Sequence, residues 1–278
     1  MLRFILIATA LLDLTLNAAD KPFDLPGMRH DIEFAKIGDV SLTLDAFVPE
    51  GAGPFATCIL VHGGGFTKGD KQSFIKPLFE PLAKAGFAWF TINYRLAPQH
   101  AWPACADDVA TAITWVKTHA ADYKADPRRI ALIGESAGGH LVSWAGVTGT
   151  GATRVAAVVP FYAPHDLVVQ VQLRQALGGL GGLIGTEELN EAAWKKLAAI
   201  SPVNFIKPGL PPFFQIHGDK DERVPLAQSL TFASKMKAAG NVCETLTITG
   251  GGHGMGGWEK LESDYQSKLI DWLRRTLN

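Results

Sequence analysis

Cysteine is scarce in this sequence of 278 residues. The three cysteines, Cys58, Cys105 and Cys243, are too few for a disulfide framework. Cys58 lies in an apolar run typical of a buried strand, where a free thiol packs like a small apolar side chain. Stability must therefore come from the core. With 47% hydrophobic residues, the chain can bury a substantial core as one domain.

An excess of charge of one sign is also absent. Lysine and arginine number 26, aspartate and glutamate 27, and the net charge is −1. The basic residues are scattered and form no stripe, which argues against nucleic acid or an anionic membrane surface as a partner. No group of His, Asp and Glu has the spacing of a zinc or calcium site, so we expect no metal and no cofactor. The expected partner is a small molecule.

No apolar run near the N-terminus is long enough to span a bilayer. A basic start is followed by an apolar stretch from Phe4 to Leu16 and by small residues up to Ala19. This order is typical of a signal peptide over residues 1–19, and it predicts a secreted or periplasmic protein. Asp13 interrupts the apolar stretch, so an N-terminal extension is the alternative. Residues 20–278 are then expected to form a single catalytic domain.

The hydrophobic periodicity predicts an α/β fold. Period-two alternation on either side of Gly38 indicates a hairpin, and strand and helix patterns then alternate, as expected for parallel strands with crossover helices. We expect about eight strands in a mostly parallel sheet, with helices on both faces. The predicted strands are 32–37, 42–47, 56–61, 87–93, 129–133, 155–159, 213–217 and 244–249, and the predicted helices are 75–85, 104–120, 226–239 and a C-terminal helix whose core-facing stripe is Leu261, Tyr265, Leu269 and Trp272.

A serine framed by glycines lies between one of these strands and a helix-like stretch. The motif is Gly134-Glu135-Ser136-Ala137-Gly138. In a strand–turn–helix context, Gly-x-Ser-x-Gly predicts a nucleophile elbow, in which a strained turn exposes the serine Oγ at the N-terminus of a helix. A plain glycine-rich turn would be the alternative. We interpret Glu135 as a supporting residue, because the position before the nucleophile points away from Oγ.

A second glycine-rich element favours the catalytic interpretation. His62-Gly63-Gly64-Gly65-Phe66 follows a buried-looking strand, and a triple glycine leaves backbone amides free to face an oxyanion. We expect the oxyanion hole to consist of the Gly64, Gly65 and Ala137 amides, with the His62 ring bonded to the backbone of the loop. No Gly-Lys-Ser/Thr follows the glycines, which argues against a phosphate-binding loop.

Together these motifs resemble those of the α/β-hydrolase superfamily, over nearly the whole chain. Within it the sequence resembles the hormone-sensitive-lipase-like and the feruloyl/acetylxylan-esterase-like (BD-FAE-like) groups with a His-Gly-Gly-Gly oxyanion loop. Further matching segments are 93–98, 126–130 and 212–225. The last of these is closer to the feruloyl/acetylxylan group, because the Asp-Pro-Leu context of the lipase-like group is absent. The resemblance implies an α/β-hydrolase fold and a serine esterase.

A serine nucleophile needs a histidine base and a carboxylate, in the chain order Ser, Asp or Glu, His. Among the histidines after Ser136, only His253 follows the last predicted strand, in a glycine-rich loop that can reach the sheet edge. Asp219 and Asp221 share one turn, and the residues alone separate them poorly. The family pattern His-Gly-x-x-Asp-x-x-Val-Pro falls on Asp221, which leaves Asp219 to stabilise the turn.

The segment 167–200 has no strand pattern and is rich in Gly and Leu. Because such insertions lie over the carboxyl ends of the strands in this superfamily, we expect a partial cap; an ordinary helical connection is the alternative. Rings near these loops are candidates for stacking on a sugar or a phenolic acyl group, although core packing is the favoured explanation of each one taken singly. They are Phe66, Trp102, Phe161, Tyr162 and Trp258.

The sequence therefore predicts a carboxylic ester hydrolase with Ser136, Asp221 and His253 as its triad. The resemblance, together with the predicted signal peptide, points to short acyl or aryl esters, including acetyl or feruloyl esters of plant polysaccharides or oligosaccharides. An amide-cleaving enzyme on the same scaffold, such as an aryl formamidase or an oligopeptidase-like peptidase, is the nearest alternative. A cholinesterase-like binding module without activity is the alternative from another functional class.

Overall fold

The computed structural model describes residues 23–278, so the predicted signal peptide lies outside the described residues. One eight-stranded sheet forms the centre of the molecule, in the order β1-β2-β4-β3-β5-β6-β7-β8. Strand β2 pairs antiparallel with β1 and β4, and the remaining pairs are parallel. The strands are β1 (Met28–Ile37), β2 (Val40–Phe47), β3 (Phe55–Val61), β4 (Ala88–Ile92), β5 (Ala125–Glu135), β6 (Ala157–Phe161), β7 (Phe213–Gly218) and β8 (Cys243–Ile248).

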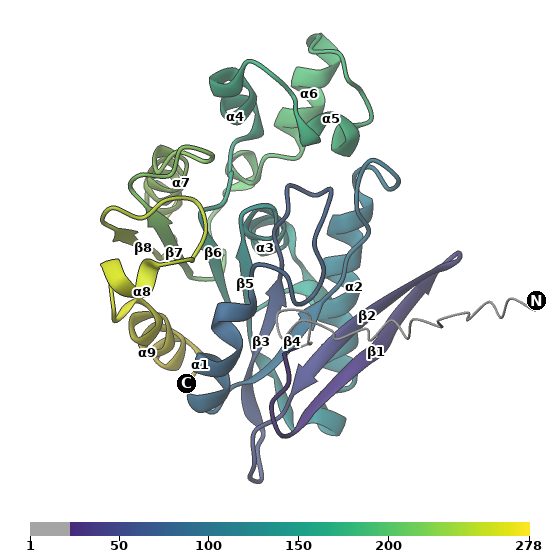
Figure 1. Cartoon of the computed structure of the whole chain (residues 1–278), viewed down its shortest axis with the longest axis vertical. Helices are drawn as coiled ribbons and strands as arrows, with labels where there is room; N and C mark the ends of the chain where they lie inside the picture. The colour runs from purple at the N-terminus through teal and green to yellow at the C-terminus, as the bar shows by residue number, and fades with distance from the viewer. Residues whose placement is uncertain (1–22) are drawn as a thin grey trace, which may run out of the picture.

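Helices cover both faces of the sheet, as predicted (Figure 1). One apolar cluster joins α2, α3 and α7 to the sheet, and a second joins α1, α8 and α9 to its other face. The central strands β4 and β6 are buried along their whole length, which explains why their sequences are nearly continuous apolar runs. The helices are α1 (Phe79–Lys84), α2 (Ala104–Thr118), α3 (Ala137–Thr148), α4 (Leu167–Arg174), α5 (Gly179–Ile184), α6 (Glu191–Ala199), α7 (Ala227–Ala238), α8 (Trp258–Leu261) and α9 (Tyr265–Leu277).

Two predicted helices differ from the structure. The predicted helix 75–85 is split into a 3₁₀ turn, Lys76–Leu78, and the short α1. The predicted C-terminal stripe is wrong at Leu261, which ends α8 and is exposed, whereas Tyr265, Leu269 and Trp272 of α9 are buried. The chain leaves the helical pattern at Glu262 (φ −140°, ψ 85°), so the spacing of four between Leu261 and Tyr265 does not place them on one helix face.

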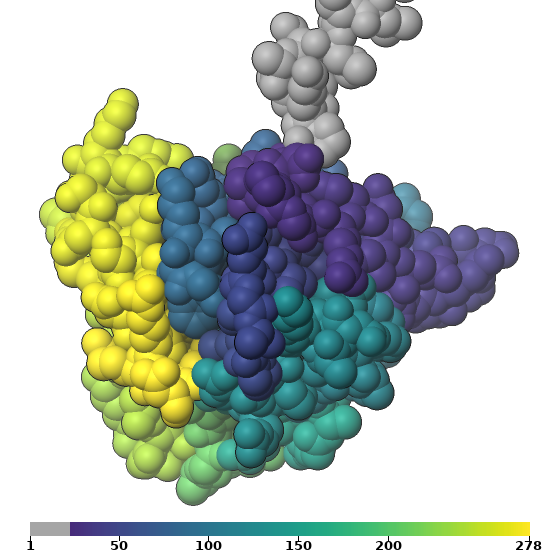
Figure 2. Space-filling view, turned by 90° about the horizontal axis from the view of Figure 1, so that it is seen from below, coloured from purple at the N-terminus to yellow at the C-terminus, as the bar shows by residue number. Residues whose placement is uncertain are grey.

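The end of the chain packs beside α1. Seen from below, the C-terminal segment lies against the residues of α1 (Figure 2). Gln266 donates to the Pro77 carbonyl and Arg274 to the Ala85 carbonyl. The first and last parts of this helical layer therefore support each other on one face of the sheet.

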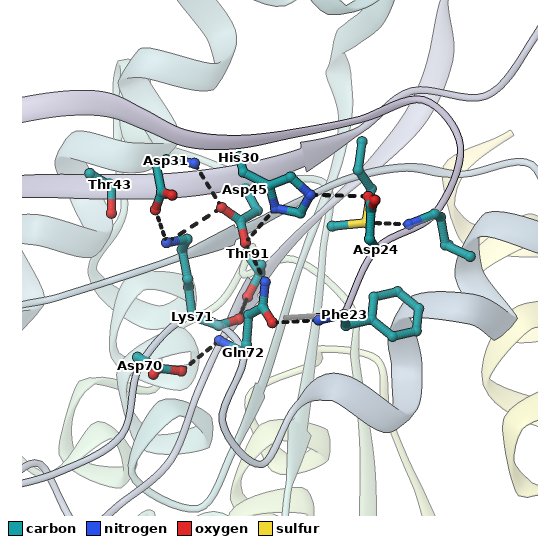
Figure 3. Close-up of polar contacts among 12 residues, drawn as sticks. Phe23, Asp24, His30, Asp31, Thr43, Asp45, Asp70, Lys71, Gln72 and Thr91 are labelled. Atoms are coloured by element: carbon teal, nitrogen blue, oxygen red, sulfur yellow. Dashed lines mark hydrogen bonds and ion pairs between the residues drawn. The ribbon is translucent and has the colours of Figure 1, made fainter. Parts of the chain in front are cut away.

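A buried aspartate joins the N-terminal hairpin to the loop that precedes α1 (Figure 3). The Asp45 carboxylate of β2 accepts hydrogen bonds from the Asp31 amide at 2.9 Å and from the Gln72 side chain at 2.8 Å. The Lys71 ammonium lies 3.4 Å from it, and the His30 ring lies 3.3 Å from it. Because Asp45 is fully buried, these partners offset the cost of removing its charge from water.

The segment 167–199 consists of α4, α5 and α6, which lie over the upper ends of the central strands (Figure 1). Asp166 begins α4, and its side chain accepts from the Val168 and Val169 amides. Asn190 caps α6 in the same way. Within residues 23–278, no helix is both long and apolar enough to cross a membrane.

Candidate active site

Ser136 lies at the sharp turn between β5 and α3, with φ 54° and ψ −116°. This conformation is strained for a residue with a side chain, and it lifts the hydroxyl away from the strand. The turn also needs close approach of two backbones: a Cβ on Gly138 would lie only 2.1 Å from the Val61 carbonyl oxygen. The glycines of the motif therefore permit the elbow that the sequence predicts.

Ser136, His253 and Asp221 form one hydrogen-bonded chain. His253 Nε2 lies 3.0 Å from Ser136 Oγ, and His253 Nδ1 lies 2.7 Å from Asp221 Oδ2. An ionised carboxylate only accepts, so Nδ1 carries the hydrogen and Nε2 is free to accept from the serine hydroxyl. The structure thus brings together the three predicted residues, although His253 lies 117 residues from Ser136 and 32 from Asp221 along the chain.

Asp221 is held by more donors than the sequence suggested. Its other oxygen accepts from the Arg223 amide at 2.9 Å and the Val224 amide at 2.8 Å. Burial alone would raise the pKa of Asp221, but hydrogen bonds from His217, His253 and the Val224 amide hold that pKa well below its usual range. The carboxylate therefore stays ionised opposite His253.

Sequence reasoning missed the part that His217 plays here. The His217 Nε2 atom lies 2.8 Å from the Val224 carbonyl and 3.3 Å from Asp221 Oδ2. Both neighbours are acceptors, so Nε2 carries the hydrogen and Nδ1 accepts from the Ser229 hydroxyl at 2.8 Å. The ring therefore fixes the loop of the acid. The motif His-Gly-x-x-Asp, with its histidine four residues before the acid, was the available signal.

Asp219 has a separate structural position. Its Oδ1 accepts from the Gly250 amide at 2.7 Å, which ties the turn after β7 to the turn after β8. It makes no contact with His253 among the hydrogen bonds and ion pairs of the described residues. The structure therefore separates the two aspartates that the residues alone left open, and Asp219 stabilises the turn as expected.

The glycine-rich loop after β3 lies beside Ser136. Gly64 and Gly65 line a cavity together with Ser136 and Ala137. Gly64 has φ 103°, and a Cβ there would lie 1.9 Å from the Lys68 carbonyl oxygen, so the loop admits only glycine at this position. His62 Nδ1 donates to the Gly63 carbonyl at 2.8 Å, and the ring stacks on Tyr94 with centroids 4.3 Å apart. This is the hydrogen bond expected for His62.

Glu135 supports this loop directly. Its carboxylate accepts from the Gly63 amide, and a Cβ on Gly63 would collide with it. Burial raises the pKa of Glu135 to about 7, although hydrogen bonds from Gly63 and the Tyr162 hydroxyl lower it. The side chain thus points away from the Ser136 hydroxyl toward the oxyanion loop, in agreement with its expected supporting position.

The cavity in front of Ser136 has a volume of about 560 Å³, which is the size of a small-molecule site. The Tyr162 ring lines it and lies 4.8 Å from the His253 ring. The segment 167–199 contributes Leu167, Gln170, Arg174, Gly179 and Leu180 to the cavity wall. It is therefore more than a helical connection remote from the site.

Among the five candidate rings, only two reach the cavity. Phe66 and Tyr162 line it, although both are mostly buried. Phe161 and Trp258 pack in the core, and Trp102 lies in a separate hollow against Trp144, with ring centroids 4.9 Å apart. These three rings are therefore not placed to stack on a substrate in this cavity, and they pack in the layers beside the sheet, which is the explanation favoured for each ring taken singly.

The remaining histidines of the interior are neutral packing residues. Burial lowers the pKa of His140 to about 4 and that of His165 to about 3. His140 bonds to the Ile200 carbonyl, and His165 stacks on Phe232. In residues 23–278 no group of three or more His, Cys, Asp and Glu side chains is arranged to hold a metal ion.

Comparison with curated proteins finds esterases. The probable carboxylic ester hydrolase LipM of Mycobacterium tuberculosis is 35% identical over 188 residues, which cover 64% of this chain and 44% of LipM. Esterase LipQ of the same organism is 32% identical over 66% of this chain and 46% of its own length. The chain thus matches about half the length of these relatives.

Solved structures match over more of their length. A truncated carbohydrate esterase from gut microbiota superposes with a TM-score of 0.79 at 28% identity, covering 90% of this chain and 95% of that one. Esterase 2 of Thermogutta terrifontis matches with TM-scores of 0.72 in a propionate-bound form, at 28% identity over 89% and 93% of the two chains, and 0.73 in a form phosphorylated by paraoxon, at 27% identity over 90% and 94%.

A family model also matches most of the chain. The BD-FAE model covers residues 44–236, from β2 through the elbow and the segment 167–199 to α7. The mostly parallel eight-stranded sheet with helices on both faces, together with the matches to solved esterase structures, fits an α/β-hydrolase fold. The chain therefore belongs to the BD-FAE family of α/β-hydrolase-fold proteins.

Proposed function

We propose that the protein is a serine carboxylic ester hydrolase that works through an acyl-enzyme. The observation that carries this proposal is the chain of hydrogen bonds from Asp221 through His253 to Ser136, at 2.7 and 3.0 Å. The names of the relatives LipM and LipQ as esterases support the same chemistry. No metal or cofactor is needed for acyl transfer by such a triad.

The proposed reaction has two matching halves. His253 Nε2 takes the Ser136 proton while Oγ attacks the ester carbonyl, and the Gly64, Gly65 and Ala137 amides stabilise the oxyanion. The C–O bond to the alcohol then breaks, and His253 gives its proton to the leaving oxygen. Water attacks the acyl-enzyme by the same path and releases the acid. Asp221 holds the imidazole in the tautomer with hydrogen on Nδ1 and stabilises the imidazolium.

Short acyl or aryl esters are the proposed substrates, including acetyl or feruloyl esters of plant polysaccharides and oligosaccharides. The family match supports this, as does the similarity to a gut-microbiota carbohydrate esterase. The propionate-bound form of the Thermogutta esterase supports a short acyl group. The cavity of about 560 Å³, whose wall includes residues of α4 and α5, has the size of a small-molecule site.

Substitution of the nucleophile tests the activity. We expect Ser136→Ala to lower kcat on 4-nitrophenyl acetate by about 10⁴ to 10⁶ without loss of the folded state. Paraoxon should phosphorylate the native protein at Ser136 and leave the variant unmodified, as read by mass spectrometry of the peptide. Near-native turnover by a folded Ser136→Ala variant would contradict the proposal. A native protein that paraoxon does not label would favour the binding module without activity.

A substrate panel tests the specificity. It compares 4-nitrophenyl esters of increasing chain length with acetylated xylan, methyl ferulate and an N-formyl arylamine. We expect acetyl and feruloyl esters to be preferred. A preference for acyl chains beyond about ten carbons, which need an extended apolar pocket, would indicate a lipase. Faster cleavage of the formamide than of any ester would favour the amide-cleaving alternative.

We also propose that the protein is exported, with cleavage after Ala19. The support is the sequence pattern of residues 1–19 alone. N-terminal sequencing of the protein from a cell fraction outside the cytoplasm should begin at Asp20. Recovery of the chain with its original N-terminus, inside the cytoplasm only, would contradict export.

A further inference from the structure

Three basic side chains line the cavity in front of Ser136. Lys68 comes from the segment after the oxyanion loop, Arg174 from the end of α4 and Arg223 from the loop of Asp221. Among the described residues that line the cavity, Glu135 is the only carboxylate, and its pKa is raised to about 7 by burial. The cavity wall is therefore positive, although the whole chain has a net charge of −1.

Arg174 is held in place beside Arg223. Its Nη2 donates to the Arg223 carbonyl at 2.8 Å, and Gln170, one turn earlier in α4, donates to the same carbonyl at 2.6 Å. These two bonds fasten α4 to the loop that carries Asp221. The Arg174 guanidinium is thereby held beside the backbone of Arg223, and both residues line the cavity.

These cations have no anionic partner within residues 23–278. The ion pairs of the described chain include other lysines and arginines, such as Arg95 with Asp108 at 2.7 Å, but none includes Lys68, Arg174 or Arg223. Burial and the charge of Arg223 lower the pKa of Arg174, while Asp221 raises it. The Asp221 carboxylate, which is bonded to His253, therefore offsets part of the repulsion between the two arginines but forms an ion pair with neither of them.

From this arrangement we propose that the preferred substrate is an ester that carries a carboxylate, which Arg174 and Arg223 bind while Ser136 attacks the ester carbonyl. The inference rests on the proposed function and adds the charge of the substrate to it. The planar fork of a guanidinium donates two parallel hydrogen bonds to a carboxylate, and such charge-assisted bonds are about twice as strong as neutral ones. An acidic sugar or a half-ester of a dicarboxylic acid has this chemistry.

Two pairs of substrates matched in size test the proposal. Monomethyl adipate and its amide, methyl adipamate, place the charge on the acyl side. 4-Acetoxyphenylacetate and 4-acetoxyphenylacetamide place it on the alcohol side, insulated from the leaving oxygen. We expect kcat/KM for the charged member of at least one pair to exceed that of the neutral member about tenfold, a difference of about 1.4 kcal/mol. The pair that responds identifies the side of the ester that carries the charge.

Variants connect the preference to the two arginines. We expect Arg174→Gln/Arg223→Gln to bring the ratio of charged to neutral substrate to about one, and Arg174→Lys to retain part of it. Lys235→Gln/Lys237→Gln removes the same two positive charges at exposed positions of α7 and should keep the native ratio. Raising NaCl from about 50 to about 500 mM should also reduce the native ratio. Circular dichroism checks that each variant is folded.

The outcomes separate this inference from the proposed function. If 4-nitrophenyl acetate and the neutral substrates are hydrolysed but neither charged member is preferred, the inference is wrong and the esterase activity stands. The inference is also wrong if the double variant keeps the native ratio. If no ester in the panel is hydrolysed by the folded native protein, both the proposed function and the inference are wrong.

Discussion

At the scale of single residues, the two aspartates after β7 differ in what they accept. Asp221 accepts from the imidazole of His253, whereas Asp219 accepts from the Gly250 amide. We expect Asp221→Asn to lower kcat/KM on short esters by about 10⁴, because an amide nitrogen facing Nδ1 inverts the histidine tautomer. Asp219→Asn is the matched control and should lose less than about tenfold. Steady-state kinetics with 4-nitrophenyl acetate gives the ranking, and the reverse order would mean that the acid is Asp219.

The raised pKa of Glu135 leads us to expect that the stability of the protein depends on pH. Its pKa is raised from 4.5 to about 7 by burial. Between these values the native state holds a proton that the unfolded state has lost, so the free energy of unfolding should fall as pH rises from about 4.5 to about 7. At 1.36 kcal/mol per pH unit, the loss is about 3 kcal/mol.

The test is urea denaturation of Glu135→Gln across this pH range. Over this pH range the free energy of unfolding of the variant should fall by about 3 kcal/mol less than that of the native protein, because glutamine does not titrate. Asp271→Asn, which removes an exposed carboxylate of α9, should keep the native dependence. A Glu135→Gln curve parallel to the native curve would refute the assignment.

At the scale of elements, the elbow depends on how closely α3 approaches β3. A Cβ on Gly138 would lie 2.1 Å from the Val61 carbonyl oxygen and 2.4 Å from that of His62, and both are backbone atoms that cannot rotate away. We expect Gly138→Ala to reduce the free energy of unfolding by about 3 kcal/mol or more, as measured by chemical denaturation. Gly256→Ala, where a Cβ meets nothing within 4 Å, should change it by less than about 1 kcal/mol.

At the scale of the whole molecule, Asp45 joins the edge hairpin to the segment that leads from the oxyanion loop to α1. Asp45→Ala would leave Lys71 with only the exposed Asp31 as its anionic partner and would leave the Gln72 amide without its acceptor. We expect a loss of about 3 kcal/mol in the free energy of unfolding, by chemical denaturation. The exposed Asp39 of the same hairpin provides the control Asp39→Asn, and an equal effect of both substitutions would contradict the argument.

The sequence by itself determined the fold class and the order of the main elements. Alternating apolar runs and helical patterns suffice for this, because each strand or helix must bury its own face. It also selected Ser136 and His253, since a strained glycine-framed turn and a glycine-rich loop after the last strand are local features. Leu261 shows the limit of such patterns, because its spacing fits α9 although the backbone breaks at Glu262.

The residues alone left Asp219 and Asp221 open, and only the family pattern pointed to Asp221. The tertiary structure shows why the two differ: they lie in one turn, but the side chain of Asp221 faces His253 and that of Asp219 faces the Gly250 amide. The tertiary structure also places Arg174 of α4 beside Arg223, 49 residues further along the chain, where the Arg174 guanidinium donates to the Arg223 carbonyl. Neither side chain has a distinctive local pattern. Contacts of this kind depend on how separate elements are packed against the sheet edge, and spacing along a chain contains no information about that packing.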